Sequence, residues 1–259
     1  MEETVVVDLL EGMATTRAIR RYTDEPVTDE QLQQMLFAAT RAPSGSNRQA
    51  FRFVVLRDSD VARQAKELIA AEATTFWDAK RRADGYDSGS GVEGDSPKAR
   101  MARAMQSYVD GFADVPVLIL PCLVRYRPPN ATEGASIYPA CQNLLLAARA
   151  IGLGGVLTGW HAAVEPELRA LLGIPDDVFI AAAITIGHPV GGHGPVRRRP
   201  IAELIYEDRW DESPPWATDP PGTRFTSAGP PKARRKKLKA IKSRWIFRFN
   251  PCSMNSSQI

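Results

Sequence analysis

Three apolar segments constrain the fold more strongly than any other feature of this sequence. Five of the six residues from Phe51 to Leu56 are apolar, and residues 114–124 and 179–187 form similar runs. Short, continuous apolar runs bounded by turn residues are typical of strands that are buried on both faces. We therefore expect a central sheet that is covered on both sides.

Segments with helical spacing separate these strands. Residues 28–39 begin at Thr28, whose hydroxyl can cap the first turn, and Gln31 completes a capping-box pattern. We also expect helices over 5–16, 61–82, 98–112, 136–151 and 165–172, and a further short strand within 152–160. Helix 136–151 is apolar around most of its circumference, which indicates burial on all sides, and contact between subunits is one way to achieve it. The elements do not form a regular βαβ repeat, so the sequence favours an α+β sandwich over a doubly wound sheet.

Composition divides the chain into a body and a tail. The 259 residues are 44% hydrophobic, enough for a sizeable core. From Trp216 onward there are ten Lys/Arg and one acid, whereas the rest has 23 basic and 29 acidic residues. We expect one domain over 1–213 and a proline-rich, then basic tail over 214–259 without a core of its own.

Several classes of protein are not expected. Cys122, Cys141 and Cys252 lie far apart, so the sequence favours a reducing, cytoplasmic location over secretion. The acidic start lacks the basic residues of a signal peptide, and no apolar run is long enough to cross a membrane. There is no phosphate-binding P-loop, and we expect no metal site from the three histidines.

Two arginine clusters stand out in an otherwise acidic body. Arg17, Arg20 and Arg21 have helical spacing, and Arg197 and Arg198 lie in the run "VRRRP". Guanidinium groups match the geometry of phosphate. Either cluster could be a solvated surface, the first paired with Asp24 and Glu25, but a phosphate held from both ends of the domain would explain the two together.

Two further stretches could contact a ligand. Ser44, Asn47 and Gln49 bring hydrogen-bonding groups, and Gly45 allows backbone approach, immediately before a buried strand. A plain helix-to-strand loop is the alternative for this stretch. The second, "IGLGGVLTGW", resembles a dinucleotide fingerprint only superficially, because its glycines follow a helix and lead into a strand. They suggest tight packing instead, with the backbone of Leu157, Thr158 and Gly159 available to a ligand.

Taken in order, these pieces resemble the nitroreductase family of flavin enzymes. The matching stretches are Arg17-Ala18-Ile19-Arg20-Arg21-Tyr22, Pro26-Val27 with Leu32, the run from Ala42 to Phe51, Gly152-Leu153-Gly154, "LLGIPDD", "IGHP" and "RRRPIAELIYEDRW". The resemblance covers residues 5–210.

This resemblance implies a three-layer α+β sandwich with a mostly antiparallel sheet, a homodimer, and FMN at the dimer interface. It implies that the loop with Pro43, Ser44, Gly45, Asn47 and Gln49 borders the partner subunit's flavin. The remaining implied contacts are Arg17, Ala18, Arg20, Arg21, Arg197 and Arg198 near the phosphate, and Leu157, Thr158 and Gly159 along the ring.

The reaction implied is electron transfer from NADH or NADPH, through FMN, to a small oxidant such as a nitroaromatic compound or a quinone. Because the cofactor carries this chemistry, we name no catalytic side chain. The alternatives are reductive dehalogenation, flavin destruction by oxygen, a flavin-sequestering protein without turnover, and non-specific binding of nucleic acid or anionic membranes through the tail. The sequence departs from the family at Thr16 and Ala18, where an Arg and a Ser are common, and at Ala50, where Pro is common.

Overall fold

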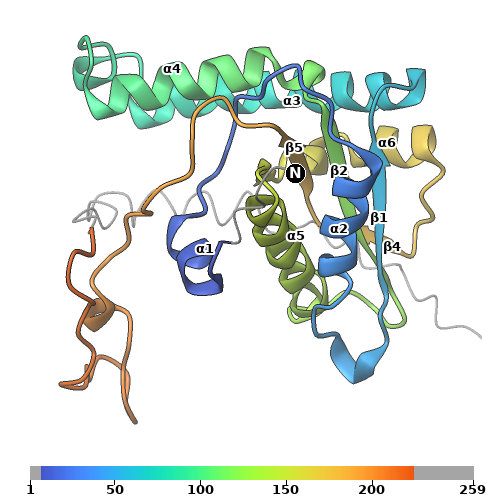
Figure 1. Ribbon diagram of the computed structural model, residues 1–259. Coiled ribbons are helices and arrows are strands. Elements are labelled where there is room, and N and C mark those ends of the chain that lie inside the picture. The colour runs from blue at the N-terminus through green and yellow to red at the C-terminus, as the bar shows by residue number, and fades with distance from the viewer. Residues whose placement is uncertain (1–6, 225–259) are drawn as a thin grey trace, which may run out of the picture. The chain divides into compact units, whose positions relative to one another are not determined.

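The computed structural model describes residues 7–224, which form two units, one up to Val196 and one from Arg197 onward. The first unit is a sheet flanked by helices (Figure 1). The helices described are α1 (Leu9–Thr15), α2 (Asp29–Ala39), α3 (Asp60–Asp84), α4 (Pro97–Asp110), α5 (Tyr138–Ala150) and α6 (Glu165–Leu172). The strands are β1 (Phe51–Leu56), β2 (Val117–Val124), β3 (Gly154–Thr158), β4 (Val178–Ile180) and β5 (Ala183–Gly187).

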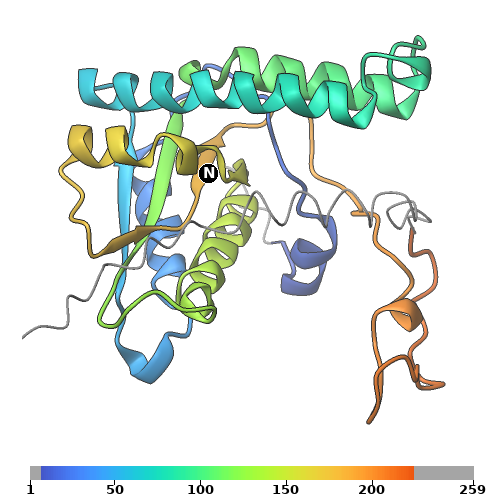
Figure 2. The same cartoon turned by 180° about the vertical axis from the view of Figure 1, so that it is seen from behind.

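The sheet is antiparallel throughout, in the order β1-β2-β5-β3, with β4 also paired to β2. Strand β2 lies at the centre and contacts three others. Its side chains alternate between two cores: Leu118 and Leu120 pack with α3, α4 and α6, whereas Val117 and Ile119 pack with α2 and α5. The predicted three-layer α+β fold is therefore confirmed (Figures 1 and 2).

Local sequence sets the ends of the helices. Thr28 and Gln31 form the predicted capping box at the start of α2, with bonds of 3.2 Å and 2.9 Å to the backbone. Ser59 caps α3 in the same way. Gly85 ends α3 in the left-handed region (φ 66°), where glycine has no steric penalty.

Helices α3 and α4 lie side by side, and the turn between them lies at one end of the pair (Figure 1).

The single strand expected over 179–187 is wrong, because the structure has two. Cys122 pairs with Ile180 and Ile119 pairs with Ile184, so the β4–β5 side carries one extra residue opposite β2. Pro121 lies opposite this break and has no N–H to donate, although its carbonyl accepts from Ala181 N–H at 2.8 Å. A β-bulge is the usual way to absorb such an extra residue.

Helix α5 is not buried on all sides within the described chain. Ala140, Cys141, Leu144 and Ala148 are buried, but Tyr138 is 45% exposed and the remaining faces are largely half-buried. Any further cover must come from outside residues 7–224, as the expected partner subunit would provide.

The second unit is described as far as Arg224. Asp219 accepts a hydrogen bond from Ile201 N–H at 3.1 Å, and Trp216 Nε1–H donates to Glu207 at 3.2 Å. Residues 216–219 therefore contact residues 201–207. The basic run that begins at Lys232 lies outside the described residues.

Candidate functional site

The segment Arg17–Arg21 is fixed beside β3 through its backbone. Ile19 N–H donates to Gly155 O at 3.0 Å, and Val190 N–H donates to Arg21 O at 2.9 Å. Gly154 allows the close approach, because a Cβ at that position would lie 2.5 Å from Cγ1 of Ile19. The predicted tight packing around these glycines is thus present at Gly154.

His193 holds the start of this segment. Its Nδ1 accepts from Arg17 N–H at 3.2 Å, and its Nε2 lies 3.2 Å from Leu153 O, which can only accept, so the ring is neutral with the proton on Nε2. Burial lowers the pKa of His193, and the nearby positive charges of Arg149 and Arg17 lower it further. The guanidinium of Arg17 donates to Pro195 O at 2.9 Å.

The arginines of this segment have no acidic partners among residues 7–224. Neither Arg17, Arg20 nor Arg21 forms an ion pair there, and the Glu25 carboxylate lies 3.5 Å from Nδ1 of His188 instead. The expected alternative pairing with Asp24 and Glu25 is therefore absent among residues 7–224, although Arg17 and Arg21 are exposed to solvent. Arg20 is half-buried. Positive charges gathered without a carboxylate leave their donors available to an anion.

Behind the arginines lies a buried group of three hydroxyls. Tyr22 Oη is 2.7 Å from Thr185 Oγ1 and donates to Ile19 O at 2.8 Å, and Tyr108 Oη is 2.9 Å from the same Thr185 oxygen. Burial raises the pKa of both tyrosines well above the ordinary value. These hydroxyls therefore stay protonated and serve as hydrogen-bond partners that hold the segment in place.

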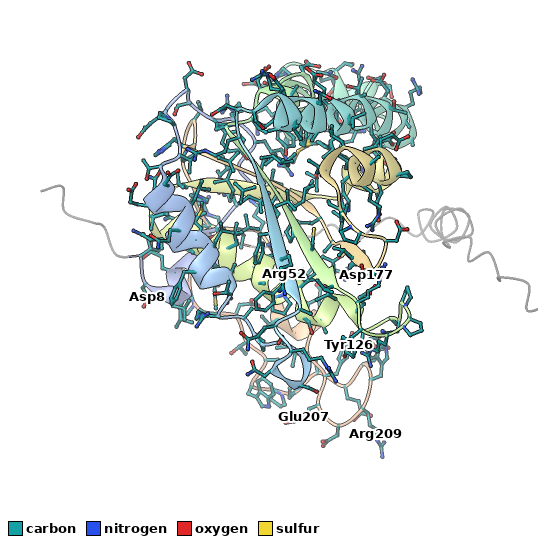
Figure 3. The ribbon with its side chains drawn as sticks, turned by 90° about the vertical axis from the view of Figure 1, so that its right-hand side faces the viewer. Asp8, Arg52, Tyr126, Asp177, Glu207 and Arg209 are labelled. Carbon is teal, nitrogen blue, oxygen red and sulfur yellow. The ribbon has the colours of Figure 1, made fainter. Side chains whose placement is uncertain are left out.

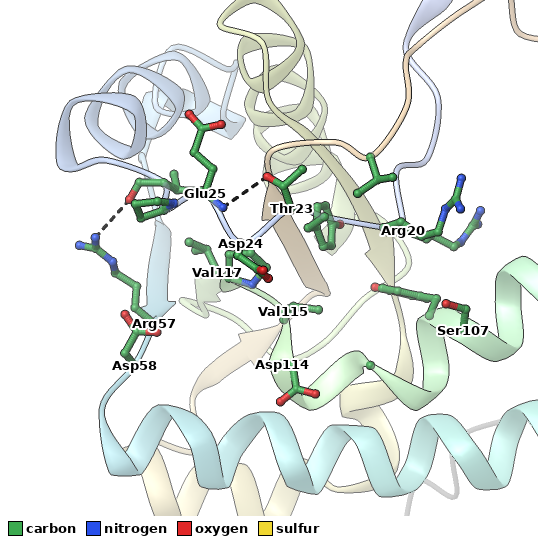
Figure 4. A pocket seen from close by; sticks show the side chains of 18 residues that line it. Arg20, Thr23, Asp24, Glu25, Arg57, Asp58, Ser107, Asp114, Val115 and Val117 are labelled. Atoms are coloured by element: carbon green, nitrogen blue, oxygen red, sulfur yellow. Dashed lines mark hydrogen bonds between the residues drawn. The ribbon is translucent and has the colours of Figure 1, made fainter.

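A cavity of about 680 Å³ opens beside this segment, and both Tyr22 and Tyr108 line it (Figure 4). Arg20 lies on one side of it, and Arg57 and Asp58 lie on the other. The lining also includes Arg21, Tyr22 and the N-terminal end of β2, but none of the other residues predicted for the site. Its walls carry charges of both signs, so the cavity does not by itself indicate one class of ligand.

The loop before β1 has a strained backbone. Ser46, Asn47 and Gln49 have φ values of 53°, 50° and 50°, in the left-handed region that residues other than glycine rarely adopt. Ser44 Oγ accepts from Gln49 N–H at 2.9 Å, and Ser136 Oγ accepts from Gly45 N–H at 3.1 Å. Strain of this kind is retained where surrounding contacts impose it, often at functional sites.

The end of β3 is open. Leu157 is 39% exposed, and a Cβ at Gly159 would meet no atom within 4 Å. Thr158 is half-buried and donates to Ala183 O at 3.3 Å. The backbone at this end is accessible to a flat ligand.

One chain brings together only part of the predicted site. Residues 17–21 and β3 are neighbours, whereas the loop of residues 43–49 lies at the opposite end of the sheet from residues 20–27 (Figures 1 and 2). Ala18 and Pro43 are exposed in these two segments. Arg197 and Arg198 belong to the second unit, where Arg198 donates to Arg197 O at 3.0 Å.

Sequence reasoning missed two residues beside Arg17. Neither His193 nor Arg149 was singled out from the sequence. Nε of Arg149 is buried and has no hydrogen-bond partner among residues 7–224. A charged residue on an otherwise apolar helix face was the available signal for Arg149, whereas nothing local distinguishes His193.

Two negative findings apply to the described range 7–224. No three His, Cys, Asp or Glu side chains gather there as a metal site. No helix in that range combines the length and the apolar character that crossing a bilayer requires.

Comparison with known proteins identifies relatives. NADH dehydrogenase of Thermus thermophilus is 28% identical over 79% of this chain and 98% of its own length. Iodotyrosine deiodinase 1 of Rattus norvegicus is 29% identical over 71% of this chain and 63% of its own length. A crystal structure from Desulfovibrio desulfuricans, solved in complex with FMN, is 31% identical with a TM-score of 0.56, and the match covers 80% of this chain and 99% of that one. The family model described as "Nitroreductase family" matches residues 13–188, and the chain belongs to that family.

Proposed function

We propose that this protein is an FMN-dependent oxidoreductase that takes electrons from NADH or NADPH and passes them to a small oxidant, such as a nitroaromatic compound or a quinone. The observation that carries the proposal is the set Arg17, Arg20 and Arg21, without ion pairs in residues 7–224, beside the start of β3, a strand whose other end is open at Gly159. The FMN complex of the 31% identical relative supports the same cofactor.

The residues present fit FMN. Arg17 and Arg20 offer positive charge to the phosphate, and His193 fixes the backbone that carries Arg17. Arg21 and Ala18 belong to the same segment, and we propose that Arg197 and Arg198 join them at the phosphate. The backbone of Leu157, Thr158 and Gly159 is proposed to lie along the ring.

A second copy of the chain completes the proposed site. Ser44, Gly45, Asn47 and Gln49 lie in a loop at the opposite end of the sheet from residues 20–27, so we propose that they border the partner's flavin in a homodimer. Pro43 shapes this loop. The half-buried faces of α5 are consistent with such a partner.

FMN supplies the redox chemistry when it is bound. The side chains of this chain bind and position it, and none is well suited to supply a nucleophile. Burial raises the pKa of the Cys122 thiol to about 11 and that of Cys141 to about 12, so both stay protonated. We accordingly propose no catalytic side chain.

Two predictions remain untested. One is the division of the chain into a domain over 1–213 and a tail over 214–259, and the other is a cytoplasmic location. Trp216 and Asp219 bond to residues 201–207, so a truncation that tests the division is better placed after Arg224 than after residue 215. We expect a chain of residues 1–224 to keep its flavin and its turnover.

Reductive dehalogenation is a second candidate, favoured by the similarity to iodotyrosine deiodinase 1. It would use the same flavin and a different oxidant. Steady-state rates with 3-iodotyrosine and with 4-nitrobenzyl alcohol, each at saturating NADH or NADPH, distinguish the two reactions. NAD(P)H oxidation with either oxidant contradicts a purely flavin-sequestering role.

Titration with two flavins tests the cofactor site. A charge-assisted hydrogen bond contributes roughly 1.5–3 kcal/mol, so Arg20→Ala should weaken FMN binding by about ten- to a hundredfold. Riboflavin has no phosphate and should bind the wild type and this variant almost equally. Arg82→Ala, on the exposed end of α3, is the matched control and should change neither affinity. Equal losses for FMN and riboflavin would mean that Arg20 supports the fold and not the phosphate.

A further inference from the structure

A second group of arginines surrounds Tyr126. This residue lies just past the end of β2, at the end of the sheet away from α3 and α4 (Figure 3). The guanidinium carbon of Arg48 lies 4.2 Å from the centre of its ring, and that of Arg127 lies 5.3 Å from the same centre. Two cations from separate parts of the chain thus share one aromatic ring, which is itself 54% exposed.

Stacking leaves the donors of these arginines available. A cation–π contact uses no oxygen acceptor, so the N–H groups of these guanidinium groups can still donate hydrogen bonds to an anion. Among residues 7–224, Arg48 donates no side-chain hydrogen bond, and Arg127 donates only to Thr132 Oγ1 at 3.3 Å. Neither forms an ion pair in that range.

The neighbouring Arg125, in the same segment, differs because it has an acidic partner. Its guanidinium lies over Phe179 at 5.1 Å and is bonded to the Glu133 carboxylate at 2.5 Å. Glu133 is therefore already used. Neither Arg48 nor Arg127 pairs with a carboxylate among residues 7–224, so an anion in contact with both would offset their mutual repulsion.

A small hollow of about 30 Å³ lies at this cluster. Ser44, Gly45 and Ser136 line it together with Arg48 and Arg127, and so do Arg125 and Glu133, which are paired with each other. Asn47 and Gln49, on either side of Arg48, both have left-handed backbones. Each such residue costs roughly 1–3 kcal/mol, so the loop keeps a conformation that chain connection alone does not require.

We infer that Arg48, Tyr126 and Arg127 form an anion-binding subsite, which holds a carboxylate or phosphate group on a molecule that reacts at the flavin. The inference rests on the proposed function, because it places the loop of residues 43–49 beside a flavin. Two sources share this chemistry: an acidic aromatic oxidant, and the phosphates of NADH or NADPH. Both would present an anion to the arginines while a planar group reaches the ring of the cofactor.

Calorimetric titration with unreactive probes tests the subsite. Benzoate represents the acidic oxidant, benzamide is its neutral counterpart, and ADP-ribose represents the phosphate-bearing half of the donor. The wild type is compared with Arg48→Gln and Arg127→Gln, and Arg82→Gln serves as the control. Loss of a charge-assisted bond should weaken anion binding roughly tenfold or more in either variant, with benzamide and Arg82→Gln unchanged.

The outcomes separate the sources. Weaker benzoate binding alone assigns the subsite to an acidic oxidant, weaker ADP-ribose binding alone assigns it to the donor, and a loss for both assigns it to a shared anion position. Unchanged anion affinities, or an equal loss for benzamide, would overturn the inference. Flavin content, read from absorbance in every preparation, is a separate measurement: a flavin-free protein that still binds the anions contradicts the proposed function but not the subsite.

Discussion

The two arginine groups of the first unit are held in different ways. Arg17, Arg20 and Arg21 belong to a segment whose backbone is fixed to β3 and to the loop at His193. Arg48 and Arg127 come from two separate segments and meet only through the ring of Tyr126. The first group is positioned by main-chain bonds, although the side chains of Arg17 and Arg21 are exposed, and the second group is positioned by side-chain contacts with an exposed ring.

This difference affects how each group should respond to change. A segment fixed by its backbone moves as a whole, so a substitution that displaces it should alter stability and cofactor binding together. A stacked pair depends on one ring, so substitutions there should alter ligand affinity with little effect on folding. The following predictions test this distinction, from the largest expected effect to the smallest.

Gly154→Ala should have the largest effect. The added methyl group would lie 2.5 Å from Cγ1 and 2.8 Å from Cβ of Ile19, so β3 and the Arg17–Arg21 segment would have to separate. Overpacking of this kind costs roughly 1–3 kcal/mol of unfolding free energy. We expect a lower urea midpoint and weaker FMN binding in the same variant.

Gly192→Ala is the matched control, because a Cβ at that position meets no atom within 4 Å. It should leave the urea midpoint unchanged. If Gly154→Ala lowers stability but FMN affinity stays at the wild-type value, the segment and the phosphate site are not coupled as proposed.

Tyr22→Phe and Tyr126→Phe compare the two arginine groups directly, because each substitution removes one hydroxyl oxygen from one group. The Tyr22 hydroxyl is bonded to Ile19 O and Thr185 in a half-buried setting, and leaving such partners unsatisfied costs roughly 1–3 kcal/mol. The Tyr126 hydroxyl has no hydrogen-bond partner among residues 7–224, and phenylalanine keeps the ring that the two arginines contact.

We therefore expect Tyr22→Phe to lower the free energy of unfolding and Tyr126→Phe to leave it unchanged. Urea denaturation of both variants is the measurement. Equal destabilisation would show that the Tyr126 cluster also supports the fold, which would weaken its assignment as a ligand subsite.

The features that could be predicted from the sequence are those formed by residues close together in the chain. The capping box at Thr28, strand β1 and the segment from Arg17 to Tyr22 each lie within a few positions of one another, so their patterns could be recognised. The bulge between β4 and β5 was missed because it depends on the residue that lies opposite Pro121 in another strand. The Tyr126 cluster was missed for the same reason, since Arg48 and Arg127 become neighbours only when β1 pairs with β2. The anchoring of Arg17 by His193 likewise joins residues far apart in the chain.

The smallest predicted effect concerns pH. His193 is neutral in the folded protein, with a pKa below its ordinary value because of burial and of Arg149 and Arg17 nearby. The unfolded chain binds a proton on this ring at a pH of about 6.5. As the pH falls below this value, the unfolded state binds a proton that the folded state does not. The contribution of neutral His193 to the free energy of unfolding is therefore fully present above about pH 6.5 and is lost as the pH falls towards the lower pKa of the folded state.

Protonation at Nδ1 would also remove the acceptor of Arg17 N–H and add a positive charge to the segment. His193→Gln keeps an acceptor at that position but cannot titrate. The fall in urea midpoint between pH 7.5 and pH 5.5 should therefore be smaller in this variant than in the wild type. The fall that remains in the variant should include the contribution of buried His161, whose pKa is also lowered by burial.

Benzoate affinity at the Tyr126 cluster should not follow this titration, since arginine stays charged throughout the range. An identical pH dependence in wild type and His193→Gln would show that His193 does not hold the arginine segment, which would then be fixed by the hydrogen bonds of Ile19, Arg21 and Tyr22.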